Sequence, residues 1–169
     1  TTSMATHIFM EAGADPTVMI GGTLPLLHSG YRVGQGDTII LESCEYCNSF
    51  LNFFPTVAVI LNVEEDHLDF FKDLADIEHS FHAFADLVPQ RGYIISNADD
   101  AGARDSVKGL QHPVFTFAVQ DRTADCVADN VSFFDGCPVF DVVIHGEVYA
   151  HVELKIPGKH NILNTLAAA

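Results

Sequence analysis

The sequence has few positive charges and no long apolar stretch, and these two absences exclude several classes of protein. Eight lysines and arginines stand against 23 aspartates and glutamates, which gives a formal net charge of −15. Such a chain cannot build the basic stripe that binds a nucleic-acid backbone. No apolar run approaches the roughly 20 residues needed to cross a bilayer. We therefore expect neither a nucleic-acid partner nor a membrane partner.

A secretory signal is also missing from the sequence. The first residues, Thr1 to Met4, have no basic segment and no cleavage-site pattern after them. Export is therefore unsupported, and we expect a cytoplasmic location.

Cysteines are few, and only two of the four are closely spaced. Cys44-x-x-Cys47 has a spacing found in zinc and redox sites. A zinc site would need a second close pair, and Cys126 and Cys137 do not form one. We interpret all four as free thiols, which is the ordinary state inside the cell, and keep zinc and redox roles as alternatives.

The hydrophobic pattern predicts an α/β fold with a mostly parallel sheet flanked by helices. Hydrophobic residues make up 48% of the chain, enough for one globular domain over residues 1–169. The apolar runs at 37–42 and 56–63 are typical of parallel strands that are buried on both faces. Strands and helices then alternate, as in an α/β sheet. The expected elements are helix 4–12, strand 17–20, strands 37–42 and 56–63, helix 73–87, strand 93–96, a short helix after 97–100, and strand 114–117.

The pattern changes within residues 123–156, where no helix separates the strands. Three strands, 126–134, 139–144 and 148–156, are divided by tight turns at Asp135-Gly136 and His145-Gly146. We expect a small antiparallel meander beside the main sheet. A last helix begins after Pro157-Gly158 and runs to the end of the sequence.

Polar side chains follow two of the expected parallel strands. Glu42 ends the strand 37–42, and Asp66 and His67 follow the strand 56–63. Ligands of open parallel sheets bind at the carboxyl ends of strands, so Glu42 and His67 should lie at one sheet edge and face one cleft. A carboxylate and an imidazole are suitable ligands for Mg²⁺ or Mn²⁺. The alternative is a solvated glutamate and a histidine satisfied by hydrogen bonds.

Three segments resemble motifs of the Mur ligase family, and most of all its UDP-N-acetylmuramate–L-alanine ligases. They are Glu-Ser-Cys-Glu-Tyr-Cys-Asn-Ser-Phe-Leu at 42–51, Leu-Asn-Val-Glu-Glu-Asp-His-Leu-Asp at 61–69, and Pro-Gly-Lys-His-Asn-Ile-Leu-Asn-Thr-Leu-Ala-Ala at 157–168. Asp15-Pro-Thr and Gly21-Gly22 also fall where the family has them. Their order and spacing fit the whole chain, which therefore resembles the central ATP-binding domain, a fold of the P-loop type.

The resemblance implies roles for particular residues. Glu42 would bind the metal on the ATP phosphates, and His67 would bind a second metal near the acyl-phosphate site. Asn161 and Asn164 would face the adenine, with His160 of the same motif also at the nucleotide. Residues three apart share a helical face, and an amide suits the mixed edge of a purine. The alternative for Asn161 is a helix N-cap.

Two departures from the family pattern stand out. Many relatives carry Asp where this chain has Cys44 and Cys47, which leaves the role of these two positions open. The family's Gly-x-x-Gly-Lys-Thr phosphate loop is absent from the sequence. We expect that loop upstream of Thr1, together with flanking domains for the UDP-sugar and the amino acid. The 169-residue chain alone is expected to be inactive and to bind ATP weakly.

The resemblance implies an ATP-dependent ligase of peptidoglycan precursor synthesis, with ATP and Mg²⁺ or Mn²⁺ as cofactors. A carboxylate of UDP-N-acetylmuramate would attack the γ-phosphate, and the amine of L-alanine would displace phosphate from the acyl phosphate. No residue is an obvious nucleophile, so catalysis would rest on the metal scaffold and on positioning. The alternatives are a murein-peptide recycling ligase, a folylpolyglutamate synthase, or a non-catalytic nucleotide-binding module.

Overall fold

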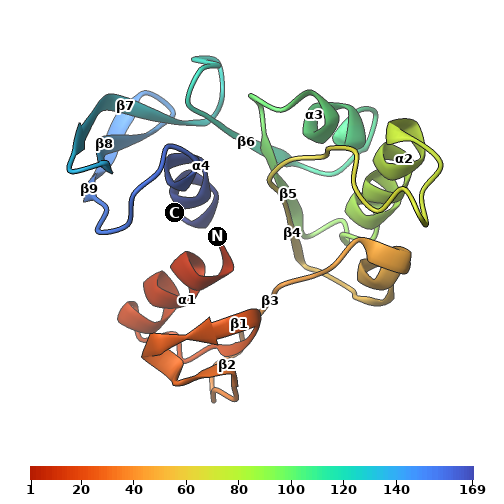
Figure 1. Cartoon of the computed structure of the whole chain (residues 1–169), viewed down its shortest axis with the longest axis horizontal. Coiled ribbons are helices and arrows are strands. Elements are labelled where there is room, and N and C mark those ends of the chain that lie inside the picture. The colour runs from red at the N-terminus through yellow and green to blue at the C-terminus, as the bar shows by residue number, and fades with distance from the viewer. The chain divides into compact units, whose positions relative to one another are not determined.

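The computed structural model describes residues 1–169, which form two compact units. The first unit contains residues 1–43 with 168–169, and the second contains residues 44–167. In Figure 1 the first unit is red to orange, and the second continues from light orange to blue. No helix in either unit combines the length and the apolar character that crossing a membrane requires.

The first unit consists of a helix and a three-stranded sheet. Helix α1 (Thr2–Glu11) precedes strand β1 (Thr17–Leu24), which lies between β2 (Ser29–Arg32) and β3 (Ile39–Leu41). β1 is antiparallel to β2 and parallel to β3. β1 is longer than the expected 17–20 because Gly21-Gly22 does not end it, and the register shifts between Met19 and Leu24 instead.

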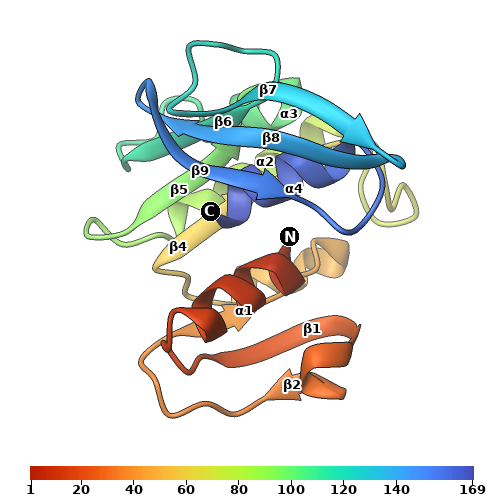
Figure 2. The same cartoon turned by 90° about the vertical axis from the view of Figure 1, so that its left-hand side faces the viewer.

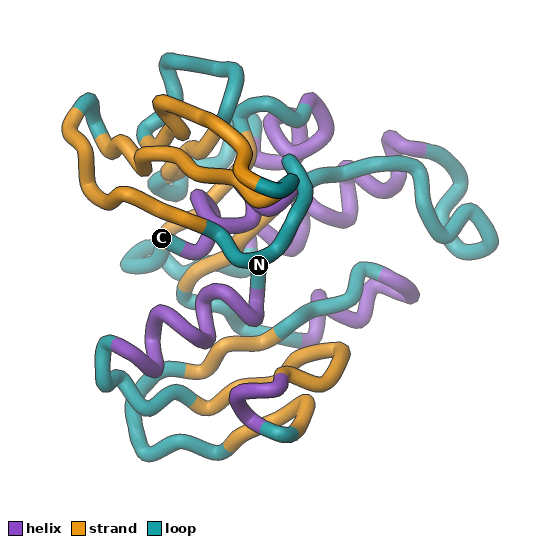
Figure 3. Tube along the Cα trace, turned by 60° about the vertical axis from the view of Figure 1, so that its left-hand side comes forward, coloured by secondary structure: helices purple, strands orange, loops and turns teal.

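The second unit is built on a six-stranded sheet in the order β4-β5-β6-β7-β8-β9. The first four strands are mutually parallel, and β7, β8 and β9 are antiparallel neighbours. Its elements, shown by type in Figure 3, are η2 (Tyr46–Asn52), β4 (Val57–Ile60), α2 (Leu74–Asp86), β5 (Tyr93–Asn97), α3 (Ala101–Val107), β6 (Val114–Ala118), β7 (Cys126–Phe134), β8 (Cys137–Ile144), β9 (Glu147–Glu153) and α4 (His160–Ala168).

Helices cover both faces of this sheet. Ile94 belongs to a core cluster with residues of α2, α3 and η2, whereas its neighbour Ile95 packs against a second cluster with α4. Successive residues of a strand point to opposite faces, so α2 and α3 lie on one face and α4 on the other. Figure 2 shows α4 beneath β8 and β9. The predicted α/β architecture is confirmed.

The antiparallel strands form where the turn residues predict them. Asp135 and Gly136 both have positive φ (48° and 77°), as do His145 and Gly146 (48° and 86°). Two consecutive positive φ values are the geometry of the two-residue turn that best matches strand twist. The meander is not a separate sheet, however. β7 pairs in parallel with β6, so the antiparallel strands extend the main sheet.

The two apolar strands expected to share one sheet are found in different sheets. β3 pairs with β1 in the first unit, and β4 is the outer strand beside β5 in the second. Neither strand is buried on both faces: Ile39 of β3 is 64% exposed and Val59 of β4 is 39% exposed. Each is an edge strand with a single hydrogen-bonded neighbour. An apolar run indicates a strand but does not specify which strand will pair with it.

Candidate functional site

The loop between β4 and α2 carries His67 in a left-handed conformation. Its φ is 53°, and its carbonyl accepts hydrogen bonds from the amides of Phe70 (2.8 Å) and Phe71 (2.9 Å). The start of the loop is fixed from the sheet side, because Asp100 accepts a hydrogen bond from the Val63 amide at 3.1 Å. Asp100 also caps α3 through the Ala103 amide. The loop therefore leaves the carboxyl end of β4 at a defined point.

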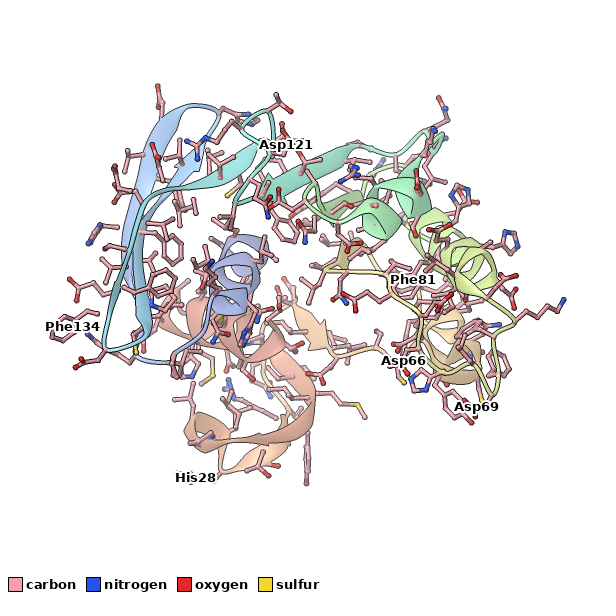
Figure 4. The ribbon with its side chains drawn as sticks, turned by 45° about the horizontal axis from the view of Figure 1, so that its top comes forward. His28, Asp66, Asp69, Phe81, Asp121 and Phe134 are labelled. Carbon is pink, nitrogen blue, oxygen red and sulfur yellow. The ribbon has the colours of Figure 1, made fainter.

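Two carboxylates lie beside the His67 imidazole. Its Nε2 is 3.3 Å from an oxygen of Glu45, and its Nδ1 is 3.8 Å from an oxygen of Asp66. One ligand atom from each of the three residues lies within 4.8 Å of the others. Figure 4 labels Asp66 in this loop. Two carboxylates and an imidazole are a donor set that fits a divalent cation such as Mg²⁺ or Mn²⁺.

Glu45 was not among the predicted ligands, and an unusual backbone turn brings it to His67. Cys47 and Asn48 follow it with positive φ values of 53° and 56°, which non-glycine residues seldom adopt. The turn is anchored by Ser80, whose hydroxyl donates to the Asn48 side chain, and by Phe50, which stacks on Phe84 with ring centroids 4.7 Å apart. Ser80 and Phe84 are far from this turn in the sequence, so residue spacing alone could not predict that Glu45 lies beside His67.

Tyr46 lies against the ring of His67. The two ring centroids are 4.7 Å apart and the rings are tilted by 38°. The Tyr46 hydroxyl donates a 2.8 Å hydrogen bond to Asp69, labelled in Figure 4. That bond, together with the negative charge of Asp69, raises the pKa of Tyr46 to about 12. The hydroxyl is therefore a donor at neutral pH.

A polar depression of about 230 Å³ adjoins the His67 loop. Its acidic lining comes from this loop and from Glu45 at the start of η2. Negative charge is therefore concentrated near the carboxyl end of β4, the place where parallel sheets generally bind ligands. Ile77 and Phe81 of α2 form its apolar part. The polar lining residues are Glu45, Asn62, Glu64, Glu65 and Asp66.

Glu42 is exposed and immediately follows β3 in the first unit. Its amide donates to the Met19 carbonyl at 2.9 Å, continuing the pairing with β1. A side chain at Gly21 would begin 2.7 Å from a Glu42 carboxylate oxygen, so the glycine leaves room for that carboxylate. The expectation that Glu42 and His67 end strands of one sheet is wrong, because β3 and β4 belong to different sheets. Its role as a metal ligand stays a prediction.

The asparagines of α4 make hydrogen bonds with each other and with the preceding turn. Asn161 is buried, and its side-chain nitrogen donates to the Pro157 carbonyl at 2.8 Å. Asn164 donates to the Asn161 side-chain oxygen at 3.2 Å. The helix begins at His160, whose exposed ring lies against Gly158. Asn161 is thus not an N-cap, and its side chain fixes the entry to the helix.

The cysteines are free thiols. Cys44 and Cys47 are exposed and flank Glu45 and Tyr46. Cys126 is buried, and burial raises its pKa to about 11, so that thiol stays protonated. No cysteine belongs to the group of close metal-binding atoms around His67.

The sheet order, the helices on both faces and the polar groups after β4 define an α/β domain with candidate ligand-binding groups at its carboxyl edge. The whole chain, residues 1–169, matches the family described as Mur ligase middle domain. The chain therefore belongs to the Mur ligase middle domain family.

Similarity to individual proteins agrees with this assignment. The chain is 42% identical to a UDP-N-acetylmuramate–L-alanine ligase of Caldanaerobacter subterraneus subsp. tengcongensis, over 99% of the chain and 36% of that protein. Among solved structures, it is 25% identical to the UDP-N-acetylmuramate–alanine ligase of Thermotoga maritima, with a TM-score of 0.82 over 99% of the chain and 36% of that structure.

Two other ligase structures share the fold. The UDP-N-acetylmuramate:L-alanyl-γ-D-glutamyl-meso-diaminopimelate ligase from Neisseria meningitides is 26% identical, with a TM-score of 0.83 over 99% of the chain and 55% of that structure. A MurF ligase of Thermotoga maritima solved in complex with ADP is 18% identical, with a TM-score of 0.73 over 99% of the chain and 40% of that structure.

Proposed function

We propose that this chain is the nucleotide-binding middle domain of a ligase that joins L-alanine to UDP-N-acetylmuramate at the expense of ATP. The chain spans about a third of the curated relatives that it matches, 36% of the first. The whole reaction therefore belongs to a longer protein. What carries the proposal is the carboxylate and imidazole group after β4 in a domain of this family. We place the reaction in the cytoplasm, where ATP is supplied.

Glu45, Asp66 and His67 would hold a divalent cation, Mg²⁺ or Mn²⁺. Glu42 is a separate candidate, as a ligand of the metal on the ATP phosphates. The bound cation would neutralise negative charge on the phosphoryl group that passes from ATP to the sugar carboxylate. The amine of L-alanine then attacks the acyl phosphate, forming the amide and releasing phosphate. The protein contributes position and charge, with none of its own side chains acting as nucleophile.

The last helix would contact the adenine of ATP. The proposal that this domain binds a nucleotide is supported by a MurF ligase of the same fold that was solved with ADP. The place of the adenine is proposed from the family motif at 157–168 and from the polar start of α4. Asn161 and Asn164 lie three residues apart near the start of this helix, and a side-chain amide carries the donors and acceptors that suit the mixed edge of a purine. His160 is exposed at the same end of the helix.

A murein-peptide ligase is the second candidate, because the structure from Neisseria meningitides has a TM-score of 0.83. The two activities differ in the amine substrate and share the sugar carboxylate. L-Alanine serves one, and the tripeptide L-alanyl-γ-D-glutamyl-meso-diaminopimelate serves the other.

The test uses the full-length protein with UDP-N-acetylmuramate, ATP and Mg²⁺, offered either amine, and follows ADP release. We expect ADP release with L-alanine and not with the tripeptide. The reverse preference would establish the second candidate. No ADP release with either amine, in protein that melts cooperatively, would contradict the ligase proposal.

A further inference from the structure

Tyr46 contacts His67 through the ring, not through the nitrogen atoms that would bind a cation. The ring centroids are 4.7 Å apart, while the nitrogens face Glu45 and Asp66. The far end of Tyr46 is held by its hydrogen bond to Asp69. The tyrosine ring is therefore fixed at its backbone end and at its hydroxyl.

The imidazole of His67 needs such a contact. Its side chain is 32% exposed, so burial does not hold it. Its backbone is left-handed and belongs to no helix or strand. A half-exposed side chain on a turn samples several rotamers unless neighbours restrict it. Metal-binding histidines generally depend on such neighbours for the orientation of the ring.

We infer that Tyr46 and Asp69 form a positioning pair, which sets the orientation of the His67 imidazole toward a divalent cation held with Glu45 and Asp66. This inference rests on the proposed function, because the cation is part of that proposal. Tyr46 supplies the surface against which the imidazole rests, and Asp69 prevents that surface from rotating away. Neither side chain needs to touch the cation.

The two parts of the pair can be separated by mutation. Tyr46→Phe keeps the ring and removes the hydroxyl, whereas Tyr46→Ser removes both. Asp69→Asn removes the charge and keeps an acceptor. Tyr149→Phe is the matched control, because it removes a hydroxyl from a tyrosine that is 67% exposed on β9.

The experiment measures Mn²⁺ binding to the full-length protein by electron paramagnetic resonance of the free ion. We expect Tyr46→Ser to raise the dissociation constant about tenfold to a hundredfold, as loss of a supporting partner does in other metal sites. Tyr46→Phe should raise it roughly threefold to tenfold, the effect of one hydrogen bond. Tyr149→Phe should leave it unchanged. In a His67→Ala background, Tyr46→Ser should not raise the dissociation constant for Mn²⁺ any further, because the imidazole is already absent.

A second measurement follows the His67 ring protons by NMR without added cation. In the unmodified protein the nearby tyrosine ring should shift their resonances, and Tyr46→Ser should remove the shift. Unchanged Mn²⁺ binding in Tyr46→Ser, with weaker binding in His67→Ala, would overturn the positioning pair and leave the proposed metal site intact. Unchanged binding in His67→Ala would instead overturn the metal site itself.

Discussion

Acidic residues in the two halves of the six-stranded sheet differ in their hydrogen-bond partners. In the antiparallel half, Asp141 accepts hydrogen bonds from Asn130 and His151, both at 2.7 Å. These bonds, first that from Asn130 and then that from His151, hold the pKa of Asp141 below its usual value. Asp125, just before β7, likewise accepts from the amide and hydroxyl of Thr116 on β6, each at 2.7 Å. These two carboxylates are paired with donors.

Four other carboxylates, beside the outer strand β4, are gathered around one depression instead. Glu45, Glu64, Glu65 and Asp66 line it together. Like charges that approach one another raise the free energy of the folded state unless a cation lies between them. The paired carboxylates stabilise the fold, whereas the gathered ones are those that we propose to lie beside the bound cation.

The largest effect should come from His67→Ala in the full-length ligase. We expect the rate of ADP release to fall about 100-fold or more, because the proposed metal ligand is lost, with little change in melting temperature. The matched control is His151→Ala, which breaks the histidine–carboxylate pair of the antiparallel half. That variant should melt at a lower temperature and keep its rate. A similar loss of rate in both variants would remove the distinction between the two halves.

Stability near the His67 loop should depend on close packing more than on charge. A side chain at Gly102 of α3 would begin 2.5 Å from the Val63 carbonyl oxygen, which cannot move easily. We expect Gly102→Ala to lower the free energy of unfolding by about 1–3 kcal/mol, as overpacking does. Urea denaturation measures it. Gly22→Ala is the control, since nothing lies within 4 Å of the added atom, and an equal loss there would contradict the packing argument.

The paired carboxylates predict a pH dependence. Burial acts to raise the pKa of Asp125, but the hydrogen bonds from Thr116 outweigh it and the net pKa is lowered. A carboxyl whose folded pKa is lowered stabilises the protein above its unfolded pKa of about 4, and that contribution is lost as the pH falls through the folded value. Unfolding midpoints in urea between neutral and acidic pH should therefore fall less steeply for Asp125→Asn. An unchanged slope would contradict this.

The smallest effect is expected from a gathered carboxylate. Glu65→Gln removes one exposed negative charge from the depression, so it should slightly raise the melting temperature without a divalent cation. Added Mn²⁺ should then stabilise the unmodified protein more than the variant. Differential scanning fluorimetry with and without Mn²⁺ measures both. A lower melting temperature without the cation would mean that Glu65 supports the fold.

Much of the second unit could be predicted because its signals are local. The turn residues Asp135-Gly136 and His145-Gly146 divide strands β7, β8 and β9 close to the expected places. The helical spacing of apolar residues predicted 73–87, and α2 covers Leu74–Asp86. The sequence also predicted that His67 lies in the loop that follows an apolar strand.

The remaining features depend on contacts between distant residues. The approach of Glu45 to His67 requires left-handed backbone at Cys47, a residue type that gives no such signal. The hydrogen bond from the Val63 amide to Asp100 joins two loops that are separated in the sequence by α2 and β5. The pairing partners of β3 and β4 are likewise a property of the folded chain, since an apolar run does not specify its neighbour.

The left-handed backbone at His67 also bears on how this domain would change under artificial selection. Glycine adopts that conformation without strain, and asparagine tolerates it better than most residues. A mutant library screened only for heat resistance should therefore accumulate Gly or Asn at position 67, while a library screened for peptidoglycan synthesis should retain His. If both screens start from the same gene, the residues selected at position 67 would distinguish the requirement of stability from the requirement of activity.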